Sequence, residues 1–214
     1  MPNWCENKLD ISGNETDIAK LREKILVKSE VGDNLNFTME LLLPTPKELL
    51  EMTSPVMWRG DENDTDGKLE FEKKVEELQQ KYGHSDWYSW RVDNWGTKWD
   101  CADSEVLDDE KEFISIFYQT AWGPNTEFVT TIGKMFPELT FKLSFEESGN
   151  GFCGVYEVTD EDTDMCEGDL EWRDEETGRL VEYNSDEELW MYSDTKEVID
   201  DEDFYPEQHN PFTD

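Results

Sequence analysis

Histidines and carboxylates are the side chains of this sequence that could catalyse a reaction. Only His84 and His209 occur in the 214 residues, and neither lies in a recognisable catalytic motif with a Cys, Ser or Glu. The 54 Asp and Glu residues are so numerous that pairs of them carry no information about acid–base catalysis. The sequence therefore predicts a protein that is not an enzyme.

A fragment of a calcium-binding pattern starts at Asp160. Asp160, Asp162 and Asp164, with Glu171 at the twelfth position of the window, follow part of the EF-hand ligand spacing. Met165 stands where that loop has the glycine of its sharp turn. Because strongly acidic sequences contain such fragments by chance, we predict no specific metal site and no cofactor, and only weak condensation of divalent cations on a polyanion.

Four tryptophans and two cations occur between residues 87 and 99. They are Trp87, Trp90, Arg91, Trp95, Lys98 and Trp99. Rings with cations alongside could stack nucleic-acid bases, but aspartates at positions 86, 93, 100 and 103 surround these cations. We interpret the segment as a packed structural motif in which the tryptophans cover a sheet and Lys98 lies over a ring or pairs with Asp100, with a protein-binding surface as the alternative.

The net charge is the property that most restricts the partners of this chain. It is −35 at pH 7, and residues 159–214 hold 22 acidic and 3 basic side chains, against 32 and 16 in residues 1–158. Such a surface repels nucleic acid and anionic membranes and attracts basic protein surfaces. Since strongly basic surfaces are typical of nucleic-acid-binding proteins, we predict a competitor that imitates the charge of nucleic acid without contacting nucleic acid or membrane.

Four groups of carboxylates in the C-terminal quarter are the expected contact residues. Residues 170–172, 180–183 and 189–192 have the pattern of strands around a turn at 174–178, so this acid is expected on ordered backbone, with a solvated disordered tail as the alternative. The groups are Asp160, Glu161, Asp162 and Asp164; Asp174, Glu175 and Glu176; Asp186, Glu187 and Glu188; and Asp200, Asp201, Glu202 and Asp203.

The end of the chain supports an alternative hypothesis. Residues 200–206 and 210–212 combine carboxylates with Phe204, Tyr205 and Phe212. Such a motif suits a basic groove that contains an apolar pocket. In this alternative, the protein is an interaction module that recruits a replication or single-strand-binding partner.

The composition indicates a folded intracellular protein. Nine Trp, seven Tyr and eleven Phe are more rings than a disordered chain usually keeps. Cys5, Cys101, Cys153 and Cys166 show no CxxC spacing, so we expect reduced thiols that are mostly buried. The start of the sequence lacks the basic and apolar regions of a secretory signal, and no apolar run has the length of a membrane span, so we expect a cytoplasmic protein.

Apolar periodicity predicts the elements of residues 1–158. Strands are predicted over residues 4–11, 34–43, 113–118, 139–145 and 152–158, and helices over residues 16–29, 45–50, 67–83 and 125–136. An insertion at 44–110 separates β-α-β from β-α-β-β, and without it the order is that of a ferredoxin-like sandwich. We therefore predict an α+β fold with an antiparallel sheet, the helices at 16–29 and 125–136 on one face, and a highly acidic, partly β extension at 159–214.

Three tryptophan-containing motifs carry a resemblance to a known family. They are MPNWCEN at 1–7, NWGTKWD at 94–100 and TAWGP at 120–124, accompanied by the strand-turn-strand region around 146–149. With these motifs, residues 1–158 resemble the YubB-type family of phage and plasmid proteins with a ferredoxin-like domain. The resemblance implies this fold and a mobile-element setting, without catalytic residues, and leaves the acidic extension outside. In that setting, the expected target is a host defence protein, such as a restriction, nuclease or CRISPR-type complex, which the protein would inhibit.

Overall fold

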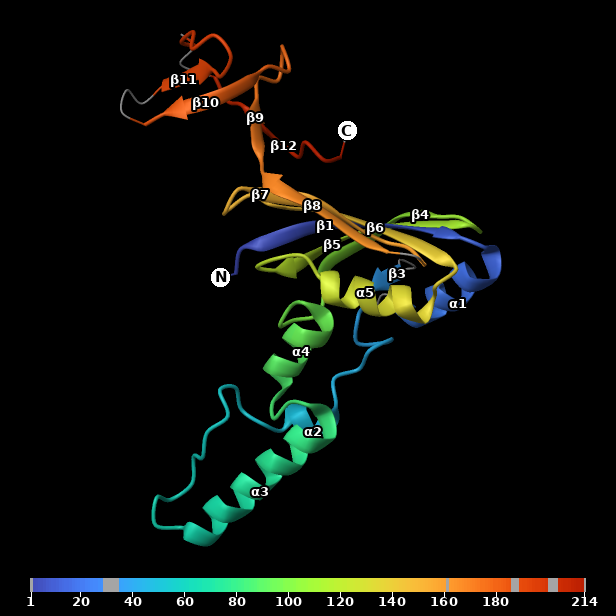
Figure 1. Ribbon diagram of the computed structural model, residues 1–214, viewed down its shortest axis with the longest axis vertical. Helices are drawn as coiled ribbons and strands as arrows, with labels where there is room; N and C mark the ends of the chain where they lie inside the picture. The colour runs from blue at the N-terminus through green and yellow to red at the C-terminus, as the bar shows by residue number, and fades with distance from the viewer. Residues whose placement is uncertain (1, 29–34, 161, 186–188, 200–203, 214) are drawn as a thin grey trace.

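A six-stranded antiparallel sheet forms the middle layer of the molecule. The computed structural model describes residues 2–28, 35–160, 162–185, 189–199 and 204–213 (Figure 1). Two helices lie against one face of the sheet, and a helical arm extends away on the same side (Figure 1). A smaller four-stranded sheet stands on the opposite side. None of the described helices is long and apolar enough to cross a membrane.

The main sheet has the strand order β4-β5-β1-β6-β7-β8. Its strands are β1 (Trp4–Gly13), β4 (Ala102–Asp109), β5 (Phe113–Ala121), β6 (Leu139–Glu147), β7 (Phe152–Val158) and β8 (Thr163–Asp169). With helices α1 (Glu15–Ile25) and α5 (Thr126–Met135), they include the chain order β1-α1-β4-β5-α5-β6 of a ferredoxin-like domain. The predicted ferredoxin-like fold is confirmed.

Buried and exposed residues alternate along the strands, and the buried ones lie on the face of the sheet that the helices cover. On β1, every second residue from Cys5 to Ile11 is buried and the residues between them are mostly exposed, as expected for a strand with one covered face. The two helices contribute to a single apolar core with these strands through Ile18, Leu21, Ile25, Phe128, Val129 and Ile132. The prediction that helices near 16–29 and 125–136 share one face is confirmed (Figure 1).

The strand predicted over residues 34–43 is wrong for the main sheet. Only β3 (Leu35–Phe37) is extended there, and it pairs with β2 (Leu26–Lys28) in a separate two-stranded sheet. The Asp100 carboxylate accepts a hydrogen bond from the Met39 backbone N–H at 2.8 Å, in place of a ladder bond. The second strand of the ferredoxin-like pattern is β4, which lies inside the region predicted as the insertion of 44–110.

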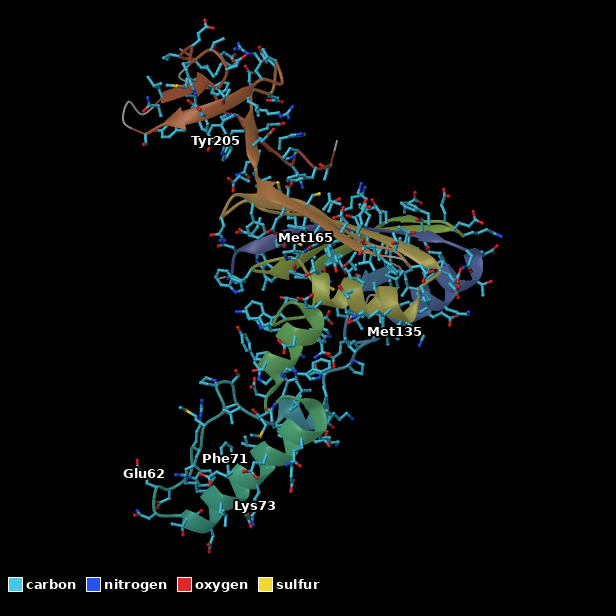
Figure 2. All side chains as sticks on the ribbon, in the orientation of Figure 1. Glu62, Phe71, Lys73, Met135, Met165 and Tyr205 are labelled. Atoms are coloured by element: carbon cyan, nitrogen blue, oxygen red, sulfur yellow. The ribbon has the colours of Figure 1, made fainter. Side chains whose placement is uncertain are left out.

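The remaining insertion forms an arm of three helices. They are α2 (Lys47–Leu50), α3 (Thr65–Tyr82) and α4 (Trp87–Trp95). The carboxylates of Asp64 and Asp86 cap the N-termini of α3 and α4, and Gly83 and Gly96 end these helices in the left-handed conformation. The predicted helices at 45–50 and 67–83 are confirmed, and Figure 2 shows Phe71 on the outer part of α3.

The tryptophan-rich segment joins the arm to the main domain. Trp95 is fully buried, its indole N–H donates to the Leu43 carbonyl at 3.0 Å, and the Arg91 guanidinium lies 4.6 Å from its ring centroid. The Lys98 ammonium lies 3.9 Å from the ring centroid of Trp99. The prediction is confirmed for the packing of Trp90 and Trp95 and for Lys98 over a ring, and it is wrong for Trp99, which is 39% exposed.

The main sheet continues by one strand beyond residue 158, where sequence analysis places the start of the extension. β8 pairs with the whole of β7, and the chain then enters a second sheet with the order β11-β10-β9-β12. Its strands are β9 (Glu171–Arg173), β10 (Leu180–Asn184), β11 (Leu189–Tyr192) and β12 (Glu207–His209). The predicted hairpin around 174–178 and the strand at 189–192 are confirmed.

Candidate functional site

A row of exposed carboxylates follows the outer edge of the main sheet. They are Asp160, Asp162, Asp164, Glu167 and Asp169, which we call the acidic edge. β8 is the last strand of the sheet, and no described strand pairs with its outer side. Because a strand rises about 3.3 Å per residue, the part of the row on β8, from Asp164 to Asp169, is about 17 Å long.

Local hydrogen bonds explain why this acidic segment is an ordered strand. The Thr159 and Asp162 backbones bond across the turn at 2.9 Å, and the Thr159 hydroxyl accepts from the Asp162 N–H at 3.2 Å. β8 then pairs with β7 residue by residue, from Thr163 opposite Val158 to Asp169 opposite Phe152. The carboxylates are therefore attached to a backbone that the apolar residues of β7 hold in place.

The cations of the C-terminal quarter do not neutralise the acidic edge. The three basic residues of the C-terminal quarter form ion pairs with other acidic residues: Arg173 with Glu171 at 2.9 Å, Arg179 with Asp194 at 2.7 Å, and Lys196 with Glu182 at 2.7 Å. Within the described part of the chain, no basic side chain forms an ion pair with a carboxylate of the acidic edge. This row of charge is uncompensated.

Asp174 differs from the other predicted contact residues because it is buried. Its carboxylate accepts hydrogen bonds from the Tyr192 hydroxyl at 2.5 Å and from the Glu176 backbone N–H at 2.9 Å. These bonds, with those from Thr177, hold the pKa of Asp174 below its usual value. Asp174 therefore stabilises the hairpin and is not available to a partner, whereas Glu175 and Glu176 beside it are exposed.

The other predicted contact residues divide between the acidic edge and parts of the chain outside the description. Asp160, Asp162 and Asp164 belong to the acidic edge, which adds Glu167 and Asp169 to the prediction. Glu161, Asp186, Glu187, Glu188, Asp200, Asp201, Glu202 and Asp203 lie outside the described residues. Among the residues that the structure covers, no group of three or more His, Cys, Asp or Glu side chains is arranged to hold a metal ion.

The aromatic residues near the C-terminus contact the rest of the fold. The Phe204 ring lies 6.2 Å from that of Trp190, and Asn210 donates to the Phe145 carbonyl at 3.2 Å. Phe212 lies against β8 at Gly168, where an added methyl group would come within 3.2 Å of its ring. Tyr205 is 89% exposed beside the four-stranded sheet (Figure 2). The C-terminal segment thus lies over the face of the main sheet that α1 and α5 leave open.

A shallow cavity of about 370 Å³ lies between this segment and the open face. Side chains of both signs line it, including Glu6, Lys8, Lys142 and Glu146. Burial, and then the neighbouring Glu6 charge, raise the pKa of Glu146. Because Lys8 pairs with Asp10 at 3.2 Å, the cavity offers neither a uniform charge nor a free catalytic pair.

Cys166 is the exposed thiol of the four, and it lies within the acidic edge. Burial raises the pKa of the Cys5 thiol to about 12 and that of Cys153 to about 11. Since the thiolate is the nucleophile, we expect an uncharged maleimide at about pH 8 to modify one thiol rapidly, at Cys166, and the others at least about tenfold more slowly. Mass spectrometry of the modified protein checks this, and Cys166→Ser should abolish the fast phase. Modification of Cys153 as fast as that of Cys166 would show that β7 and β8 do not bury Cys153.

A match to a family model supports the ferredoxin-like fold. Residues 94–193 match a family model described as the ferredoxin-like domain in Api92-like protein. A crystal structure of the protein api92 from Yersinia pseudotuberculosis is similar at 9% sequence identity and a TM-score of 0.47, over 79% of this chain and 98% of that one. No curated protein matches the sequence. The matched family model is described as Api92-like, and it does not show the YubB-type family that the sequence motifs suggest. The match runs from the end of α4 to β11, so it includes most of the acidic segment that sequence analysis places outside its family resemblance.

Proposed function

We propose that the protein binds a basic surface of a nucleic-acid-binding protein through its acidic edge and competes there with nucleic acid. The observation that carries this proposal is the acidic edge, whose five exposed carboxylates do not pair with a described cation. Asp164, Glu167 and Asp169 lie on the hydrogen-bonded strand β8, with Asp164 on the opposite face of the sheet from the other two, and Asp160 and Asp162 lie in the turn before it. A fixed row loses less conformational freedom on binding than a flexible tail, so more of its electrostatic attraction appears as affinity.

The density of charge decides how much surface the contact needs. Duplex DNA carries one negative charge per about 1.7 Å of its axis, whereas the acidic edge has three carboxylates over the roughly 20 Å of β8. The edge alone is therefore a sparse imitation of a duplex. We expect the contact to include carboxylates of the four-stranded sheet, such as Glu175 and Glu176, which are exposed at the turn between β9 and β10.

The motif resemblance to YubB-type phage and plasmid proteins supports a particular class of target. In this proposal, the protein is a cytoplasmic, non-enzymatic product of a mobile element, and its partner is a host defence protein such as a restriction, nuclease or CRISPR-type complex. Inhibition then follows from occupation of the partner's nucleic-acid channel. Capture of the partner tests this class of target.

A recruitment module that uses the aromatic C-terminal end is the second candidate. The exposure of Tyr205 favours it, because an exposed ring between a buried proline and acidic neighbours can enter an apolar pocket. Phe204 and Phe212, however, contact Trp190 and β8, so they would have to leave the fold to act. Replacing Phe204, Tyr205 and Phe212 by Ala abolishes binding under this hypothesis and has a minor effect under charge mimicry.

Affinity capture from the natural host tests the proposal. We expect the protein to retain a nucleic-acid-binding protein, and we expect their affinity to fall about tenfold or more between low and moderately high salt, because exposed ion pairs are screened within a Debye length of about 8–10 Å. Titration calorimetry at several salt concentrations measures this. Retention of no basic protein, or binding that salt does not change, would contradict charge mimicry.

A further inference from the structure

Three exposed tryptophans meet at one end of the main sheet. Trp4 begins β1, Trp99 precedes β4, and Trp122 follows β5, and their side chains are 36%, 39% and 51% exposed. The ring centroids of Trp4 and Trp99 are 6.2 Å apart. We call these residues the tryptophan cluster. Large indoles with this exposure are typical of binding surfaces, since burial in the free protein does not account for them.

The backbone of Trp122 adds a second observation. Its φ is 78°, in the left-handed region that non-glycine residues rarely adopt, and its N–H donates to the Asn3 carbonyl at 2.9 Å. A bulky residue in this conformation stores strain, and Trp122 is at the same time 51% exposed. Gly123 follows Trp122 directly, so the turn has a glycine next to the residue that adopts the left-handed conformation. The strain therefore presents the ring to solvent.

The faces of these rings already hold a cation. The Lys98 ammonium lies 3.9 Å from the Trp99 ring centroid and 5.7 Å from that of Trp122. No described carboxylate lies within ion-pair distance of Lys98, and Asp100, two residues away, accepts instead from the Met39 N–H. In a chain with 54 acidic residues, this lysine is held by aromatic rings.

We propose that the tryptophan cluster receives an arginine side chain of the basic partner and that Lys98 occupies the cluster until the partner arrives. This inference rests on the proposed function, because it takes the basic partner from it. A guanidinium is planar, permanently charged and weakly hydrated, so it stacks on indole faces better than an ammonium does. The flexible stem of Lys98 allows it to leave the rings without a change of fold.

The position of the cluster suits a contact that also includes the acidic strands. Asn3, next to Trp4, donates to the Glu147 carboxylate at 3.5 Å, and Glu147 ends β6. Gly151 lies in the turn between β6 and β7, and its carbonyl accepts a hydrogen bond from the Leu170 N–H at 2.7 Å. Leu170 is the residue at which the chain passes from β8 to β9. The cluster and the base of the four-stranded sheet therefore lie at the same end of the main sheet. One partner surface can contact both.

Hexa-arginine is a probe that tests this assignment without the natural partner. Titration calorimetry at about 0.3 M salt, where long-range attraction is largely screened, measures its affinity for the full chain and its variants. Trp122→Gly removes the ring and relieves the backbone strain, so the fold is kept, and we expect about a tenfold loss of affinity. Tyr88→Ala is the matched control, because it removes an exposed ring outside the tryptophan cluster, and it should bind as the unchanged protein does.

Removal of the internal cation gives the opposite expectation. Lys98→Met should raise the affinity for hexa-arginine about threefold more than Lys134→Met, which removes an equal charge at another exposed position. Equal effects of these two variants, or an unchanged affinity of Trp122→Gly, would overturn the proposal. Binding of a short single-stranded oligonucleotide that Trp122→Gly abolishes would also overturn it, in favour of base stacking.

The same titration, repeated at about 0.05 M salt where exposed ion pairs are screened much less, separates this inference from the proposed function. If neutralised acidic-edge carboxylates leave hexa-arginine binding unchanged while Trp122→Gly weakens it, the tryptophan cluster stands and the role of the acidic edge fails. If neutralisation weakens binding and Trp122→Gly does not, the acidic edge stands and the cluster fails.

Discussion

Replacing Trp95 by Ala is expected to lower the free energy of unfolding by about 3–5 kcal/mol. Trp95 is fully buried, and its ring centroid lies 6.1 Å from that of Trp90. Its indole N–H donates a hydrogen bond to the Leu43 carbonyl. The substitution leaves a large cavity and an unsatisfied acceptor at the junction of the arm and the sheet. Urea unfolding followed by circular dichroism measures the change.

Trp122→Gly is the control for this stability measurement. It removes the same side chain from an exposed position and relieves a φ of 78°, so we expect a change of less than about 1 kcal/mol. A loss of less than about 1 kcal/mol from Trp95→Ala as well would mean that the arm does not depend on Trp95 for its attachment.

Neutralising the whole acidic edge is expected to reduce affinity for the basic partner by about fifty- to a hundredfold. Each exposed ion pair contributes about 0.5 kcal/mol, so five together contribute about 2.5 kcal/mol, and no single carboxylate should matter much. The variant combines Asp160→Asn, Asp162→Asn, Asp164→Asn, Glu167→Gln and Asp169→Asn. Titration calorimetry against the captured partner measures the loss.

The opposite edge of the sheet supplies the matched control. β4 is also an edge strand, and it and the turn that follows carry exposed carboxylates, so charge could protect both edges from aggregation. The control variant combines Asp103→Asn, Glu105→Gln, Asp108→Asn, Glu110→Gln and Glu112→Gln, which changes the net charge equally. We expect it to keep most of the affinity. Equal losses from both variants would indicate general electrostatics, and self-association of both without loss of affinity would indicate edge protection alone.

The buried elements of the fold were predictable because their residues alternate strongly. β1, β6 and the helix α5 present regular apolar patterns, and each one lies in the single core. The edge strands were not predictable in the same way, since β4 and β8 are mostly exposed and their sequences are rich in Asp and Glu. Residues 34–43 do alternate, but Asp100 binds their backbone in place of a strand partner. The Asp100 side chain, which is 61 residues from Met39 in the sequence, therefore determines that this segment is not a strand of the main sheet.

The sequence predicts that the candidate site is acidic, but it does not predict how the acidic side chains are arranged. Asp160, Asp162 and Asp164 follow from the charge count, but the burial of Asp174 depends on the Tyr192 hydroxyl, 18 residues away. Glu167 became part of the site only once β8 was placed at an edge. The three tryptophan-containing motifs of the sequence hold the residues of the tryptophan cluster, but they are distant in the chain, and only the fold shows that they meet.

Competition with nucleic acid tests the central claim most directly. A fluorescent duplex bound to the captured partner reports its own release through the fall in anisotropy. The account predicts that the protein displaces the duplex completely, that the acidic-edge variant needs about fifty- to a hundredfold higher concentration, and that the β4 control variant resembles the unchanged protein. Formation of a ternary complex that keeps the duplex bound at saturating protein would contradict the account.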